Sequence, residues 1–548
     1  MRSGRWMVAA AVAMTMIISG APAPAAAASP ATTLAGLDLA RATVLDMQVA
    51  MNRRRLTSTA LTAVYLARIR LLNPKLHAVI ETNPDALRDA AVSDLHRRRH
   101  GARSALEGIP VLLKDNIDTA DRTRTTAGSL ALAASRPARD AFLVRRLRSA
   151  GAVILGKANL SEWANFRDTD SSSGWSARGG QTNNPYVLDR NACGSSSGSA
   201  VAAAAYLAAV TIGTETDGSI VCPAGATDTV GVKPTLGLVS RTGVIPISAQ
   251  QDTAGPITRT VTDAAAVLSV IQGVDPVDAA TAGAGRYARR DYLRTLDPGA
   301  LRGKRIGVWR GGGAEQEDVA PVLTAAVATL RARGATVVDD VDLPGLAEAF
   351  ENEFPALLVE FKHDINAYLA ARPGPHPGTL AGLIEFNRAN AETELRWFGQ
   401  DIFEAAQQTS GDLTDPAYVA ARAAATGSAR RAIDSAIAAH HLDAILAPTN
   451  GPAWVTDLEN GDDFSDFVSS SGPAAVAGYP NVTVPAGHAD GVLPLGMSFF
   501  GGRWSEPALL SVAYAFEQAT QARQVPRYQP TLPSATAPAP TDRRVPVG

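Results

Sequence analysis

Two serine-containing turns are the parts of this sequence best suited to chemistry. They span residues 194–198 (GSSSG) and 217–219 (DGS). A serine hydroxyl is a weak nucleophile at neutral pH and needs a neighbouring base to take its proton. Histidine is the usual base, but all eight histidines lie outside residues 114–257. The sequence therefore offers no histidine close to either turn along the chain.

Lys114 is the candidate base. It directly follows a short apolar strand that we predict over residues 109–113. Burial disfavours the charged ammonium form, so a lysine enclosed among hydroxyl groups can be neutral at about pH 7 to 8 and accept a proton. The alternative is a surface lysine that pairs with Asp115 or Asp118.

Ser196 is the alternative nucleophile, because the first turn also matches the G-x-S-x-G pattern of a nucleophile elbow. An elbow needs a strand before the turn and a helix after it. A helix is predicted after the turn, but residues 183–191 look like a loop, and the expected Gly-rich oxyanion loop is missing upstream. A second alternative is that Ser and Gly serve only the backbone conformation of these turns.

Short strands and helices must position these residues. We predict strands at residues 109–113, 152–155, 230–234, 238–244, 305–309, 335–341, 444–446 and 482–484. We predict helices at 142–147, 199–210 and 322–333, a Gly/Thr-rich turn at 211–219, and mostly helical structure over 346–440. The helix at 199–210 is almost entirely Ala and Val, so we expect it to be buried on all sides.

The composition excludes several classes of protein. The chain has 548 residues, of which 46% are hydrophobic, enough for a large core and too apolar for a disordered chain. The formal net charge of −2 gives no overall basic field for nucleic acid. Two cysteines cannot form a disulfide framework.

The two ends of the chain differ from the rest. Residues 1–28 combine an N-terminal Arg2 and Arg5, a short apolar run and Ala-rich cleavage sites, which predicts a cleavable secretory signal. The alternative is an uncleaved anchor, but the apolar run is short for a membrane span. Residues 531–548 are rich in Pro and Ala, and we expect them to be disordered. The mature protein is therefore expected to be secreted.

Several segments resemble the amidase signature hydrolases. Residues 108–116 (GIPVLLKDN) are similar to the strand that delivers the family's lysine, and 193–200 (CGSSSGSA) and 213–220 (GTETDGSI) to its two serine motifs. The resemblance covers about residues 35 to 525. Residues 175–181 (WSARGGQ) and 215–223 (ETDGSIVCP) look most like the bacterial secreted peptide amidases.

The resemblance implies an α/β fold in which a large twisted mixed β-sheet is surrounded by helices, as one catalytic domain over residues 29–530. It assigns Ser219 as nucleophile, Lys114 as base and Ser195, on a cis peptide bond, as the bridge between them. It gives Ser196 the role of orienting the loop. The oxyanion hole is implied to consist of the backbone amides of Thr216, Asp217, Gly218 and Ser219.

The implied reaction is hydrolysis of a carboxamide, most simply the C-terminal amide of a peptide, to carboxylate and ammonia. The resemblance implies no metal, no organic cofactor and no nucleic-acid partner. It implies no membrane contact once the signal has been cleaved, and we expect a monomer. One alternative is a glutamyl-tRNA amidotransferase A-like subunit, which export disfavours because charged tRNA is cytoplasmic. Another is a binding protein on a dead amidase scaffold, which the intact Lys114, Ser195 and Ser219 disfavour.

The sequence also departs from the family pattern. Cys193 and Ser197 replace glycines, Glu215 replaces an Asp and Asp217 a Gly, and Val221 replaces an arginine. Loss of that arginine favours a neutral or peptidic amide over a small acidic substrate. We expect Cys193 and Cys222 to be close in space but to remain buried thiols.

Overall fold

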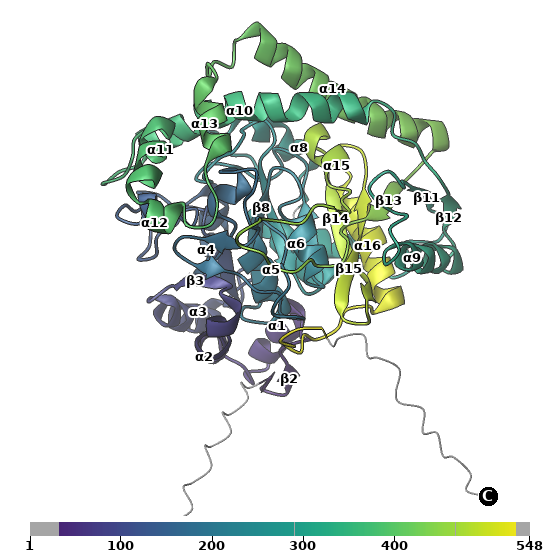
Figure 1. The fold of residues 1–548 in the computed structure, drawn as a ribbon. Helices are drawn as coiled ribbons and strands as arrows, with labels where there is room; N and C mark the ends of the chain where they lie inside the picture. Colours follow the sequence, from purple (N-terminus) through teal and green to yellow (C-terminus); the bar gives the residue numbers. More distant parts are fainter. Residues whose placement is uncertain (1–31, 290, 466, 533–548) are drawn as a thin grey trace, which may run out of the picture.

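The computed structural model describes residues 32–532 apart from 290 and 466. The predicted secretory signal and nearly all of the predicted disordered tail therefore lie outside the described residues. The described chain folds around one large sheet with helices on both sides (Figure 1).

One mixed sheet of eleven strands forms the centre of the fold. In spatial order its strands are β12 (Thr336–Val338), β11 (Arg305–Val308), β13 (Ala444–Pro448), β15 (Leu493–Phe500), β14 (Asn481–Ala489), β9 (Val230–Lys233), β10 (Thr253–Thr258), β8 (Val210–Glu215), β4 (Pro110–Lys114), β5 (Val153–Ala158) and β3 (Val79–Thr82). β4 pairs in parallel with β5 and β8, and β11 with β12 and β13, whereas the other pairs are antiparallel. The predicted α/β fold with a large mixed sheet is confirmed.

Helices surround this sheet. They are α1 (Val44–Asn52), α2 (Ser58–Leu76), α3 (Ala86–His100), α4 (Phe142–Ser149), α5 (Ser197–Ala204), α6 (Val221–Ala226), α7 (Val261–Ile271), α8 (Ala284–Tyr287), α9 (Ala320–Ala332), α10 (Leu346–Ala371), α11 (Leu380–Ala389), α12 (Ala391–Glu394), α13 (Asp401–Gln408), α14 (Pro416–His440), α15 (Gly472–Ala477) and α16 (Glu506–Thr520). Two small hairpins lie outside the large sheet: β1 (Thr33–Leu34) with β2 (Leu37–Asp38), and β6 (Trp175–Ser176) with β7 (Gly180–Gln181). None of the helices in the described part of the chain is both long and apolar enough to span a bilayer.

The strands that lead to Lys114 and to the second serine turn are buried along their whole length. Every residue of β4 and of β8 is buried. Such strands are covered on both faces, and β4 accordingly has an almost continuous apolar sequence, PVLL, before its final lysine. The apolar run therefore carries Lys114 into the interior.

Three details of the predicted elements around the serine turns are wrong. Residues 211–215 belong to strand β8 rather than to a turn, because the β-branched Val, Thr and Ile favour a pleated strand between β4 and β10. The helix predicted at 199–210 ends at Ala204. Residues 238–244 form no strand, since Gly237 and Gly243 adopt φ values of +87° and +82° and turn the chain away.

Two long helices cover one end of the molecule. Figure 1 shows α10 and α14 side by side across this end, and they pack against each other. On α10, Leu357, Phe361 and Ile365 are buried in one cluster with Trp163 and Phe166. α10 is thereby fixed beside the loops that leave the sheet.

Candidate active site

The predicted site residues come together where β4 and β8 end. These two strands are parallel neighbours, so their carboxyl ends lie at the same edge of the sheet, where open α/β folds bind ligands. Lys114 is the last residue of β4, and the chain after β8 turns through Ser219 into α6. Ser195 lies just before α5.

Lys114 contacts Ser195 directly. Its Nζ lies 2.7 Å from the Ser195 Oγ and 3.2 Å from the Thr214 carbonyl oxygen, to which it donates. The lysine is completely buried. This burial lowers its pKa to about 7, although the negative charges of Asp252 and Glu215 act in the opposite direction. A substantial fraction of Lys114 is therefore neutral near pH 7 and able to accept a proton.

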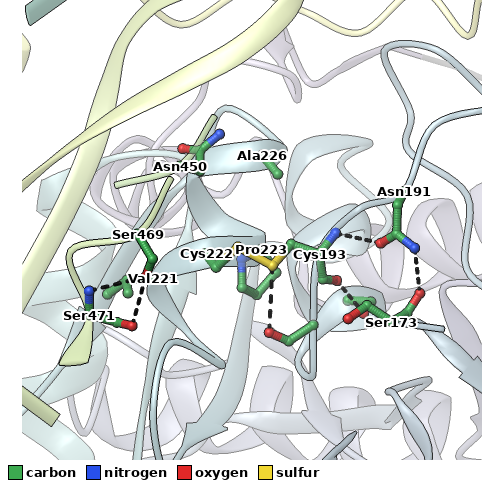
Figure 2. Close-up of a disulfide and its surroundings, with 12 residues drawn as sticks. Ser173, Asn191, Cys193, Val221, Cys222, Pro223, Ala226, Asn450, Ser469 and Ser471 are labelled. Atoms are coloured by element: carbon green, nitrogen blue, oxygen red, sulfur yellow. Dashed lines mark hydrogen bonds between the residues drawn. A yellow bond between two sulfur atoms is a disulfide. The ribbon is translucent and has the colours of Figure 1, made fainter. Parts of the chain in front are cut away.

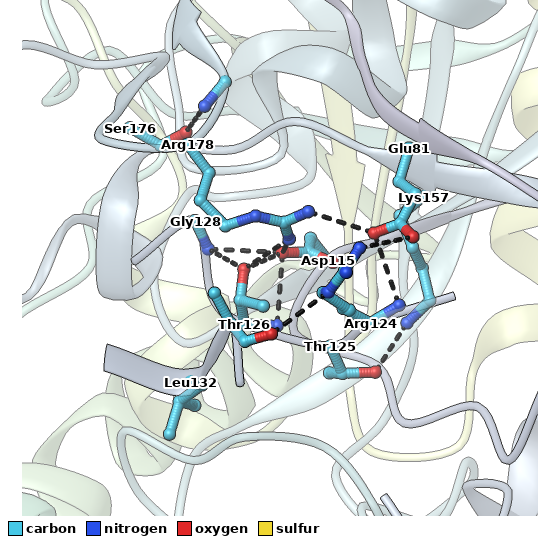
Figure 3. A network of polar contacts seen from close by, with 12 residues as sticks. Glu81, Asp115, Arg124, Thr125, Thr126, Gly128, Leu132, Lys157, Ser176 and Arg178 are labelled. Atoms are coloured by element: carbon cyan, nitrogen blue, oxygen red, sulfur yellow. Dashed lines mark hydrogen bonds and ion pairs between the residues drawn. The ribbon is translucent and has the colours of Figure 1, made fainter. Parts of the chain in front are cut away.

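Lys114 makes no pair with Asp115 or Asp118, so the surface-lysine alternative fails. Figure 3 shows the Asp115 carboxylate in a separate polar network, where it accepts a hydrogen bond from Thr126 and lies 3.5 Å from the guanidinium of Arg178. The Asp118 carboxylate accepts a hydrogen bond of 2.9 Å from the Tyr368 hydroxyl. Both carboxylates therefore have partners of their own.

Ser195 is held by an unusual backbone. The peptide bond between Gly194 and Ser195 is cis. The Ser195 carbonyl oxygen accepts a hydrogen bond of 3.0 Å from the Ser161 amide. A Cβ at position 194 would lie 2.2 Å from the Ser161 Oγ and 3.0 Å from the Ser173 Oγ, so any residue other than glycine would displace these serine side chains. The backbone thus places the Ser195 hydroxyl against Lys114.

Ser196 connects the two serine turns. Its hydroxyl donates to the Thr214 carbonyl oxygen at 3.0 Å and accepts from the Thr214 amide at 3.2 Å. Its own amide donates to the Ser219 carbonyl oxygen at 3.1 Å. Ser196 is fully buried, so its hydroxyl is occupied by structural contacts and does not face the cavity.

Ser219 lines a cavity of about 800 Å³. Glu215 fixes the turn that carries it, because its carboxylate accepts hydrogen bonds of 2.8 and 3.0 Å from the amides of Ile220 and Val221. Gly218 has φ +75°, which favours glycine. Within the described part of the chain, the amides of Asp217 and Ser219 have no hydrogen-bond partner. These N–H groups are therefore available to an oxygen in the cavity.

The remaining cavity wall is largely apolar and comes from segments far along the chain. Phe350 and Leu357 of α10 line it, together with Trp454, Phe464 and Phe467 from the connection between β13 and α15. Among the described residues that line it there is no Lys, Arg or His. The sequence motifs did not indicate this wall. The spacing of Leu346, Phe350, Glu353 and Leu357 on one helix face is the one signal that could have indicated it.

Cys193 and Cys222 form a disulfide, so the expectation of buried free thiols is wrong (Figure 2). Cys193 directly precedes the cis turn, and Cys222 lies in α6, three residues after Ser219. Their Cα atoms are 6.0 Å apart, within the usual range for a disulfide. The two turns meet only in the folded sheet, which spacing along the sequence could not reveal. The disulfide links both serine turns at the cavity wall.

The fold and this site together define an enzyme of mixed α/β architecture in which Ser219 lines the cavity and the buried Lys114 contacts the neighbouring Ser195, with no histidine among the described residues that line the cavity. The Amidase family model matches residues 60–510, so the chain belongs to the amidase signature family and is an amidase. Curated relatives of similar sequence support this family assignment. A probable amidase of Arabidopsis thaliana is 44% identical over 495 residues, covering 89% of this chain and 91% of the relative. A glutamyl-tRNA(Gln) amidotransferase subunit of Geobacter metallireducens is 34% identical over 493 residues, with 88% and 98% covered.

Among solved structures of this family, two peptide amidases are similar to this chain over most of its length. The crystal structure of the peptide amidase PAM in complex with the competitive inhibitor chymostatin superimposes with a TM-score of 0.87 at 53% identity, covering 90% of this chain and all of that one (100%). The native peptide amidase of Stenotrophomonas maltophilia gives a TM-score of 0.84 at 52% identity, with 89% and 99% covered. The predicted resemblance to the amidase signature family is confirmed.

Proposed function

We propose that this amidase is exported and hydrolyses the C-terminal amide of peptides to a carboxylate and ammonia. The observation that carries the chemistry is the 2.7 Å contact between the buried Lys114 amine and the Ser195 hydroxyl, beside the cavity lined by Ser219. A lysine with a pKa of about 7 supplies a base beside a cavity whose described lining residues include no histidine.

In the first half-reaction the Ser219 oxygen attacks the carbonyl carbon of the amide. Its proton passes to Ser195, whose own proton passes to the neutral Lys114 amine. The carbonyl oxygen becomes an oxyanion, which the free amides of Asp217 and Ser219 stabilise by hydrogen bonds. When the tetrahedral intermediate collapses, the carbon–nitrogen bond breaks. The leaving nitrogen takes the proton back through Ser195 and departs as ammonia, leaving an ester on Ser219.

In the second half-reaction a water molecule attacks the ester on Ser219. Lys114 takes a proton from this water through Ser195, and the second tetrahedral intermediate forms in the same oxyanion site. Its collapse returns the proton to the Ser219 oxygen and releases the carboxylic acid. The enzyme ends with a neutral lysine and a free serine, so atoms and protons balance over the cycle.

Three observations support a peptide amide as the substrate. The cavity of about 800 Å³ is large for a simple amide, and its aromatic wall suits apolar peptide side chains. The 53% identical solved relative is a peptide amidase that binds chymostatin. Position 221 is Val, which leaves no arginine there for a small acidic substrate.

Two observations support export. Residues 1–28 have the pattern of a secretory signal. The Cys193–Cys222 disulfide suits an oxidising compartment outside the cytoplasm, since cytoplasmic thiols are normally kept reduced.

Ammonia release from matched substrates tests the proposed reaction. We expect the enzyme to release ammonia from dipeptide and tripeptide amides, and far more slowly from glutamine or from asparagine side chains within a peptide. Labelling by a fluorophosphonate, which reacts with activated serines, separates an enzyme from a non-catalytic scaffold. Preferential hydrolysis of free glutamine would instead support the amidotransferase-like alternative.

A further inference from the structure

Two carboxyl groups face the substrate cavity. Asp217 lies in the turn two residues before Ser219, and Glu353 lies on α10, on the same helix face as Phe350 and Leu357. They are the only charged side chains among the described residues that line the cavity. A site with this composition distinguishes ligands by the sign of their charge.

Asp217 is not fully satisfied by the protein. Its Oδ1 is buried and has no hydrogen-bond partner among the described residues. Its other oxygen, Oδ2, lies next to Gly472, where an added Cβ would be 3.5 Å from it and 2.7 Å from the ring of Phe350. The carboxyl group and the aromatic ring therefore border the same small space. A buried acceptor without a donor is costly, and a ligand that donates hydrogen bonds relieves that cost.

The negative charge of Glu353 acts on Asp217. Burial raises the pKa of Asp217 well above its usual value and the negative charge of Glu353 raises it further, whereas a hydrogen bond from Ser471 acts in the opposite direction. Burial also raises the pKa of Glu353. Two carboxyl groups that disfavour each other's charge are stabilised when a cation lies between them.

No free protein cation neutralises the pair among the described residues. Glu353 accepts a hydrogen bond of 2.6 Å from Gln251, and Gln251 in turn accepts one of 3.0 Å from Arg422. The Arg422 guanidinium is itself paired with Glu360 at 2.6 Å. Lys233 is buried in β9. Its positive charge acts on Asp217, but its strongest charge interaction is with Glu215. Lys114 faces Ser195.

We propose that Glu353 and Asp217 form an acidic subsite that binds a cationic group of the substrate, either an amino group or a Lys or Arg side chain, and repels a carboxylate. The Phe350 ring borders the same space as Asp217 and adds a favourable cation–π contact to the bound cationic group. This proposal rests on the proposed function, because it names a preference among peptide amides. It also adds Glu353, on a helix outside the signature motifs, as a specificity-determining residue.

The experiment compares peptide amides that differ in one charge. Lysine, norleucine or glutamate is placed in turn at each of the last three positions, and kcat/KM for ammonia release is measured at pH 8. At one position or more, the lysine peptide should exceed the glutamate peptide by about tenfold or more, as expected for charges a few ångströms apart in a partly buried site. Norleucine should lie between them.

The variant Glu353→Gln should reduce this ratio several-fold, and Glu353→Asp, which keeps the charge, should retain most of it. Glu351→Gln makes the same change at an exposed position of the same helix and should keep the wild-type ratio. Glu353→Ala, with its fold checked by circular dichroism, provides a second neutral variant.

A wild-type ratio near one at every position, or an unchanged ratio in both neutral variants, would overturn the acidic subsite. Failure of the proposed function looks different, because the norleucine peptides would then release no ammonia at all. Hydrolysis of norleucine amides without any preference for charge therefore rejects the subsite alone.

Discussion

Lys114 shows how the environment of one residue decides its chemistry. An exposed lysine has a pKa of about 10.4 and is almost entirely charged at pH 7. The apolar sequence of β4 buries this lysine completely, and its amine finds only a hydroxyl and a carbonyl oxygen as neighbours. Neither neighbour is a carboxylate, so desolvation dominates and the pKa falls to about 7.

The pH profile tests this residue-scale account. Because the neutral amine is the active form, kcat/KM should rise with pH through an apparent pKa of about 7. Lys114→Ala should remove this rise and lower turnover by a factor on the order of 10² to 10⁴. Lys114→Arg should not restore it, since arginine stays protonated.

The control for this profile is Lys75→Ala, which removes an exposed lysine at the end of α2 and should leave the profile unchanged. If Lys114→Ala kept the rise while substitution of a histidine such as His440 removed it, the base would not be Lys114.

At the scale of elements, the motifs and the cavity wall differ in how far they could be predicted. The strand that ends in Lys114 and both serine turns are continuous segments of the sequence. Their residue order is therefore enough to identify them by resemblance to a family. Glu353, Phe350 and the disulfide depend on contacts between segments far apart in the chain. The pattern over residues 346–440 predicts only helices, and nothing in it shows which face meets the site.

The disulfide provides the prediction at this scale. It joins the two serine turns across a sequence separation of 29 residues, so it should stabilise the fold by roughly 3 to 4 kcal/mol through its effect on the unfolded chain. Cys193→Ala/Cys222→Ala should lower the free energy of unfolding in guanidinium by about this amount, and lower activity because the turns are less firmly held.

The chain contains two cysteines, so a reductant acts on this bond alone. Dithiothreitol should therefore destabilise the wild type toward the double variant and leave the double variant unchanged. Equal stability of wild type and double variant under oxidising conditions would show that the disulfide does not hold the turns together.

At the scale of the whole molecule, the N-terminal segment and the disulfide together predict export. Expressed in full in a bacterium, the chain should be recovered outside the cytoplasm, with its N-terminus between Pro24 and Ser29. A version that starts at residue 29 should stay in the cytoplasm, and once it is unfolded in denaturant both of its cysteines should react with a maleimide. Recovery of the full chain in the cytoplasm with Met1 intact would contradict export.

The central claim is that Ser219 is the nucleophile of a peptide amidase, and the most direct measurement is ammonia release from one peptide amide by two matched variants. Ser219→Ala should abolish turnover and also labelling by a fluorophosphonate, because the attacking oxygen is removed. Ser196→Ala should retain both at a reduced level, because the Ser196 hydroxyl only links Thr214 to the turn. An inactive Ser196→Ala beside an active Ser219→Ala would contradict the account and establish Ser196 as the nucleophile.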